Sequence, residues 1–210
     1  GLSHLQPGTP IAFSDKLKRE DDLISAQLDN VISAAMIIYL YQNGFQGTAF
    51  FTAQEEAGKS WRYVYEWFRK NKVSTNELLV LDTSPYDTRV EADIQQVVLR
   101  NRDANARFKS PVLKQLKNFC HKNEIDFSCK DTFIQEKNKV RKEKNLPLLT
   151  LGSTELGRIV MESKGSIQGA TLQIPTTGYH TVEETASIKA VKSILYILSS
   201  LYIDKKPNIK

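Results

Sequence analysis

The chain alternates short, continuous apolar runs with longer segments in which apolar residues recur every three or four positions. Short apolar runs are typical of buried strands, and the three-to-four spacing is typical of helices with one packed face. Strands are predicted at 11–13, 48–53, 77–82, 94–100, 125–128 and 170–174. Helices are predicted at 29–41, 61–69, 110–119, 154–161 and 182–202. Residues 16–22 are expected to form a polar loop, and 137–144 are too polar to assign.

Strands that alternate with helices predict an α/β fold, in which a mixed, mostly parallel sheet lies between helices on both faces. We expect a single domain, a three-layer α/β/α sandwich. Pro175 is expected to close the strand 170–174. Two helices have a predicted apolar face: Val31, Ala34, Ala35, Ile38 and Tyr41 in the first, and Ile188, Val191, Ile194, Leu195 and Leu198 in the last.

The composition narrows the class of protein. Of 210 residues, 40% are hydrophobic and 25% charged, which is ordinary for a soluble globular domain and excludes a collagen-like fibre or wholesale disorder. No run of about 20 apolar residues predicts a transmembrane helix, and no secretory signal is visible. Cys120 and Cys129 are interpreted as reduced thiols of a cytosolic protein.

The net charge of +5 could favour binding to an acidic partner. The basic residues cluster at 137–144 and 205–210, where a solvated helix face and a tail are the simpler interpretation. We therefore expect neither a nucleic-acid nor a membrane partner.

Five polar residues lie where predicted elements begin or end: Asp29, Glu55, Glu56, Asp82 and His180. Each has an ordinary explanation by itself, since an aspartate caps helices and forms turns, and a loop histidine is often simply exposed. Together the five residues suggest a ligand-binding site, because α/β sheets bind ligands at strand ends. Carboxylates with an imidazole suit zinc, manganese or cobalt, and a carboxylate shared by two ions builds a two-metal hydrolytic site.

Five stretches of the chain, in this order, resemble the glutamyl and deblocking aminopeptidases, cytosolic dinuclear metallopeptidases that include the tetrahedral aminopeptidases. The resemblance runs from about Pro7 to Tyr202. The stretches are Leu28-Asp29-Asn30, Thr52 to Gly58, Leu81-Asp82-Thr83, Gly152 to Glu155, and Ile174 to Glu184.

The resemblance implies a role for each matching residue. Asp29 corresponds to the aspartate that bridges two divalent metal ions, zinc in the first instance, with cobalt or manganese as alternatives. Glu55 corresponds to the general base and acid, Glu56 and His180 to ligands of one ion, and Asp82 to a ligand of the other. Glu155 falls where the family has an aspartate near the site.

The resemblance further implies a peptide substrate that is shortened from its N-terminus, a homo-oligomer as one state of the protein, and a cis peptide bond between Asp29 and Asn30.

One departure from the family concerns the second ion. The family holds it with a histidine from an upstream His-x-Asp motif, which this chain lacks, and His4 is not expected to replace that histidine. The inserted oligomerisation domain is also missing. We therefore expect a fragment, the larger C-terminal part of a catalytic domain. A pseudo-peptidase that binds one ion or none, and a related deacylase or carboxypeptidase-like enzyme, stay open as alternatives.

Overall fold

The computed structural model describes residues 16–203, so the predicted strand 11–13 and His4 lie outside the described part. In chain order, the elements are β1 (Lys18–Glu20), β2 (Leu23–Ala26), α1 (Val31–Gln42), α2 (Ser60–Asn71), β3 (Thr75–Pro85), α3 (Arg89–Asp93), β4 (Val97–Leu99), α4 (Pro111–Lys122), β5 (Phe127–Cys129), α5 (Lys130–Glu143), α6 (Glu155–Glu162), β6 (Ile167–Thr177), β7 (Glu184–Ser187) and α7 (Ile188–Tyr202).

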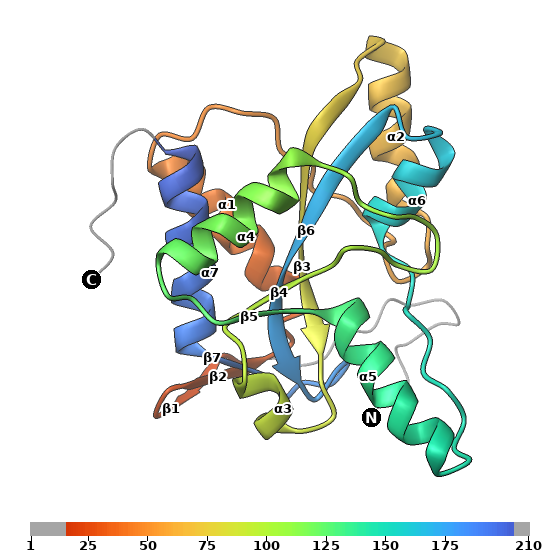
Figure 1. The fold of residues 1–210 in the computed structure, drawn as a ribbon. Helices are drawn as coiled ribbons and strands as arrows, with labels where there is room; N and C mark the ends of the chain where they lie inside the picture. Colours follow the sequence, from red (N-terminus) through yellow and green to blue (C-terminus); the bar gives the residue numbers. More distant parts are fainter. Residues whose placement is uncertain (1–15, 204–210) are drawn as a thin grey trace, which may run out of the picture.

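The strands form one mixed sheet in the order β1-β2-β7-β6-β4-β5, with β3 paired to β6 as well. The pairs β3–β6 and β4–β5 are parallel, whereas β6 runs antiparallel to both β4 and β7. Helices α1, α4 and α7 lie on one side of this sheet, and α2 and α6 lie on the other (Figure 1). The predicted α/β/α architecture is therefore confirmed.

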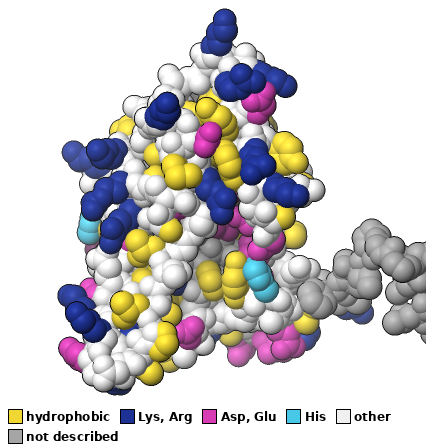
Figure 2. Space-filling model, turned by 90° about the vertical axis from the view of Figure 1, so that its right-hand side faces the viewer, with side chains coloured by type: hydrophobic (Ala, Val, Ile, Leu, Met, Phe, Trp, Pro, Cys, Tyr) yellow, Lys and Arg dark blue, Asp and Glu magenta, His cyan; other side chains and the backbone are white. Residues whose placement is uncertain are grey.

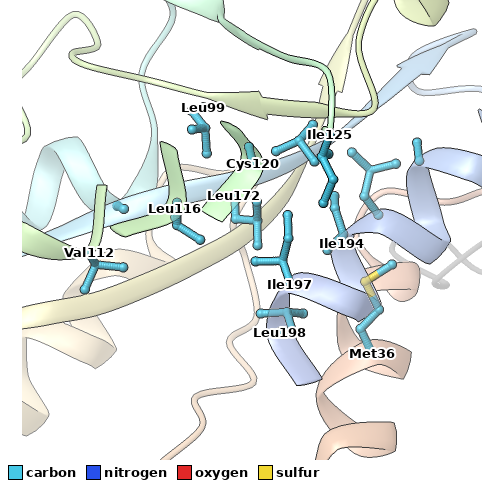
Figure 3. Close-up of a cluster of buried hydrophobic side chains, with 14 of the residues drawn as sticks. Met36, Leu99, Val112, Leu116, Cys120, Ile125, Leu172, Ile194, Ile197 and Leu198 are labelled. Atoms are coloured by element: carbon cyan, nitrogen blue, oxygen red, sulfur yellow. The ribbon is translucent and has the colours of Figure 1, made fainter. Parts of the chain in front are cut away.

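The main core lies between α1, α4, α7 and the sheet. Figure 3 shows Met36 of α1, Leu116 of α4 and Ile197 of α7 converging on Leu172 of β6. A smaller cluster on the other side packs Val64 and Phe68 of α2 against α6. Among residues 16–203, no helix is long and apolar enough to span a membrane.

The predicted strand at 48–53 is wrong, since this segment is an irregular loop. Its Phe50 packs on α2 instead, with ring centroids 5.2 Å from Trp67 and 5.9 Å from Phe68. Within residues 16–203, β3 pairs only with β6. The apolar run at 48–53 is therefore explained by packing on α2 and not by strand pairing.

The predicted buried face of α1 is also wrong. The helix buries Ser33, Met36 and Leu40, whereas Val31 is 67% exposed and Ile38 51% exposed. The helix carries apolar residues on nearly every face of its own surface. Their spacing along the sequence therefore could not predict which face is buried.

Three other boundaries differ from prediction because strand pairing decides them. The expected loop 16–22 contains β1, which pairs with β2. The strand β6 continues past Pro175 to Thr177, whose neighbour Thr176 accepts a hydrogen bond from Tyr86 N–H at 2.8 Å. Residues Glu184–Ser187 form β7 between β2 and β6, so the last helix begins at Ile188.

Candidate metal centre

Three of the predicted site residues meet in space. Asp29 precedes α1, Glu56 lies in the turn before α2, and His180 lies in the loop between β6 and β7. One ligand atom from each lies within 4.8 Å of the other two. The Nε2 atom of His180 is 2.9 Å from Oε1 of Glu56 and 3.7 Å from Oδ2 of Asp29. The three side chains are therefore close enough to share one ion. Figure 2 shows acidic side chains beside a histidine at a hollow of the molecular surface.

The backbone presents Asp29 to this cluster instead of using it as a helix cap. Asn30 occupies the N-cap of α1, so the ordinary explanation of Asp29 as a cap is wrong. The Asp29–Asn30 peptide bond is cis, as predicted. The Asn30 side chain donates a hydrogen bond to the Leu81 carbonyl at 2.8 Å, which ties the start of α1 to β3.

Asp82 lies near the end of β3 and does not join the three-residue cluster within the described part of the chain. Its Oδ1 accepts from Thr83 N–H at 2.8 Å, and its Oδ2 accepts from Gln173 Nε2 at 3.2 Å. Burial, followed by the charge of Asp29, raises the pKa of Asp82 to about 7. The negative charges of Asp29 and Asp82 therefore repel each other.

The orientation of the Gln173 side chain, which contacts Asp82, is fixed by the buried side chain of Arg100. Arg100 Nε donates to Gln173 Oε1 at 2.9 Å. Since a guanidinium can only donate, the amide nitrogen of Gln173 must face Asp82 and the Thr83 carbonyl, 2.9 Å away. Sequence reasoning missed both residues, although a glutamine inside a predicted buried strand is an unusual feature.

The carboxylates of the centre repel one another. Burial and then Glu56 raise the pKa of Asp29, while His180 lowers it. Burial and then Glu56 also raise the pKa of Glu55. Within residues 16–203, no lysine or arginine forms an ion pair with any acid of the centre. A divalent cation would relieve this repulsion, and the oxygen and imidazole donors fit such an ion.

A cavity of about 200 Å³ adjoins the cluster and is lined in part by Glu55, Glu56 and Trp61. Tyr179 lines it too, and its ring stacks on His180 with centroids 3.6 Å apart. Tyr179 was not predicted as a site residue, although it immediately precedes His180 in the sequence.

Helix α6 supplies two charged side chains to the same cavity. Glu155 accepts from Thr52 Oγ1 at 3.3 Å, and Arg158 donates from Nε to Ser153 Oγ at 2.9 Å. Both residues line the cavity. Nothing in the sequence distinguished Arg158 from an ordinary surface arginine.

The start of α6 is held in place by Asp103. Its Oδ2 accepts from both the N–H and the hydroxyl of Thr154, at 2.8 and 2.9 Å. Thr154 is the N-cap and accepts in turn from Gly157 N–H at 3.1 Å. This arrangement fixes where Glu155 and Arg158 enter the cavity.

Residues 3–197 match the family model of the M42 glutamyl aminopeptidases. The chain belongs to this family. No curated protein sequence matches it significantly.

Solved structures confirm the fold of this M42 chain. The TET1 peptidase of Pyrococcus horikoshii superimposes with a TM-score of 0.64 at 16% identity, covering 92% of this chain and 54% of that one. Aminopeptidase APDkam598 of Desulfurococcus kamchatkensis gives 0.65 at 13% identity, covering 93% and 53%. An M18 aminopeptidase of Thermotoga maritima gives 0.57 at 11% identity, covering 92% and 49%. The chain thus spans about half the length of these structural neighbours.

Proposed function

We propose that this chain carries the active-site residues of an aminopeptidase that removes N-terminal residues from peptides with the help of divalent metal ions. The observation that carries the proposal is the convergence of Asp29, Glu56 and His180, from three separate segments, within 4.8 Å. Family membership supports the same class of reaction.

The metal ligands are assigned from the geometry and the resemblance together. Asp29, Glu56 and His180 would hold one ion, and Asp29 with Asp82 would contribute to a second. Zinc is the ion we favour, and cobalt or manganese also suits these donors. When bound, such ions polarise the scissile carbonyl and lower the pKa of a bound water.

The protein's own acid–base group is Glu55. It lies in the cavity wall beside Glu56, and burial raises its pKa, which suits a carboxylate that must both accept and return a proton. Glu55 takes the proton of the attacking water and delivers it to the leaving amine. Tyr179 and Trp61 add aromatic surface to the lining of the cavity, against which an apolar part of a substrate can pack.

The cavity favours an acidic substrate side chain through Arg158. Within the described residues, this guanidinium forms no ion pair with a carboxylate, and it lines the cavity beside Gly58. A substrate carboxylate would supply the missing charge partner. The Arg158→Met variant should therefore lose kcat/KM on glutamyl substrates and keep it on leucyl substrates.

A deacylase on the same scaffold is the main alternative. Peptides with a free and an N-acetylated end distinguish the two, since an aminopeptidase cleaves only the free form. The 210-residue chain alone should turn over weakly and bind a single ion, because no histidine in residues 16–203 accompanies Asp82. The assay therefore uses the native protein that carries these residues. Equal hydrolysis of both peptides there would contradict the proposal.

The protein's assembly and location are further proposals. A dodecameric assembly is reported for the neighbour PhTET1, and the Pyrococcus horikoshii TET1 peptidase assembles into a tetrahedron or an octahedral shell. We expect a cytosolic protein that forms a homo-oligomer. Size-exclusion chromatography with light scattering of the native protein would reveal the oligomer.

A further inference from the structure

Glu184 is a fully buried carboxylate beside the backbone of Asp29, one of the candidate metal ligands. Its exposed fraction is 0%, and its Oε2 accepts a hydrogen bond from the backbone N–H of Asp29 at 2.8 Å. Its Oε1 has no partner of full hydrogen-bonding geometry within the described residues, although the backbone of Leu28 also stabilises the charged carboxylate. A buried carboxylate with one unsatisfied oxygen costs stability, so packing alone does not explain a glutamate here.

The position of Glu184 connects the two segments that deliver the ligands. It opens β7, four residues after His180, and pairs in register with Ala26 at the end of β2. The chain leaves β2 at that point and reaches Asp29 three residues later. The hydrogen bond therefore joins the segment that carries Asp29 to the segment that carries His180.

We propose that Glu184 is a positioning residue, whose buried carboxylate holds the backbone of Asp29 so that the Asp29 carboxylate faces Glu56 and His180. The proposal rests on the metal-dependent function proposed above. Groups that orient metal ligands typically change metal affinity 10–100-fold when they are removed. Glu184 would do so through the ligand's backbone rather than its side chain.

Cobalt binding to the purified 210-residue chain tests this role, followed by the visible absorption of the bound ion. Glu184→Gln keeps a carbonyl oxygen for Asp29 N–H and should bind cobalt within about threefold of the parent. Glu184→Met keeps the length but has no acceptor, and should bind about 10–100-fold more weakly. Glu184→Asp, which keeps the charge but is one methylene shorter, serves if the methionine variant does not fold, and should also bind at least tenfold more weakly.

The matched control is Gln95→Met, a buried amide that donates to the Glu91 and Ala92 carbonyls away from the cluster. It should lower thermal stability without changing cobalt affinity. Parent-like cobalt affinity in folded Glu184→Met or Glu184→Asp, or a large loss in Glu184→Gln, would overturn the positioning role alone. A parent chain that binds no cobalt would overturn the metal-dependent function and, with it, the role of Glu184.

Discussion

The Nε2 atom of His180 lies 2.9 Å from Oε1 of Glu56, although 124 residues separate the two in the chain. Both side chains are about half exposed, at 49% and 60%, so neither is fixed by core packing. The parallel strands β3 and β6 bring two of the segments together, because the Leu81 carbonyl of β3 accepts from Asn30, next to Asp29, and β6 leads into the loop of His180. A site at the end of paired strands is where α/β sheets usually bind ligands.

Replacing Glu55 by glutamine should remove the proton carrier and leave the metal ligands in place. We expect kcat to fall by about 10²–10⁴ in the native protein, with metal content and thermal stability close to the parent. Kinetics and metal analysis of the same preparation measure this. The control is Glu183→Gln, an exposed acid that pairs with Lys18 and does not line the cavity. Parent-like turnover in Glu55→Gln would remove Glu55 from the mechanism.

The metal-free protein should become less stable as the pH rises from about 4 to about 7. The pKa of Asp82 is raised from 3.8 to about 7 in the folded state, so the folded chain binds this proton more tightly than the unfolded chain. Stability is therefore favoured below the ordinary pKa and is lost as the pH rises through the folded one. The raised pKa values of Asp29 and Glu55 act in the same direction.

Chemical denaturation in the presence of a chelator measures this dependence. Asp82→Asn should flatten it, since the amide does not titrate. A metal-free stability that rises across this range, or the same slope in Asp82→Asn, would show that Asp82 is not a strained carboxylate.

Replacing Gln173 by methionine should destabilise the fold without changing the size of the side chain much. The change leaves the Arg100 guanidinium and the Thr83 carbonyl each short of a partner, which costs about 1–3 kcal/mol for each buried group. Urea denaturation measures the loss. Gln168→Met, at a partly exposed position where the amide accepts from Lys109 N–H, should cost much less. Equal losses at the two positions would contradict a special role for Gln173.

The sequence predicted the elements that local patterns determine. Ser110 before Pro111 predicted the start of α4, and the Ser110 side chain does accept from Val112 N–H. Helix α2 has well separated apolar and polar faces and was also predicted. Patterns failed where long-range pairing decides, as at Glu184–Ser187, where two neighbouring strands override a helical spacing.

The candidate site shows the same division. The sequence could identify Asp29, Glu56 and His180, because they lie at element ends and match a family pattern. The structure then places them close together. The neighbours that Gln173, Arg158 and Glu184 contact are supplied only by the folded chain. No spacing along the sequence could reveal those contacts.

Replacing Gly157 by alanine should distort the start of α6. A Cβ atom there would lie 1.9 Å from Oδ2 of Asp103, so the helix or the aspartate must move. We expect a loss of about 1–3 kcal/mol in the free energy of unfolding. A double-mutant cycle with Asp103→Ala tests the cause, because removing the carboxylate should make Gly157→Ala less costly. Strict additivity of the two changes would contradict the proposed clash.

The central claim is that Asp29, Glu56 and His180 form a binding site for a divalent ion. Calorimetric titration of the chelator-treated chain with zinc tests it most directly, beside His180→Ala and the control His121→Ala, whose ring packs on Phe127 instead. We predict one bound ion in the parent and in His121→Ala, and a loss of at least tenfold in affinity in His180→Ala. Absence of zinc binding in the parent, or unchanged binding in His180→Ala, would contradict the account.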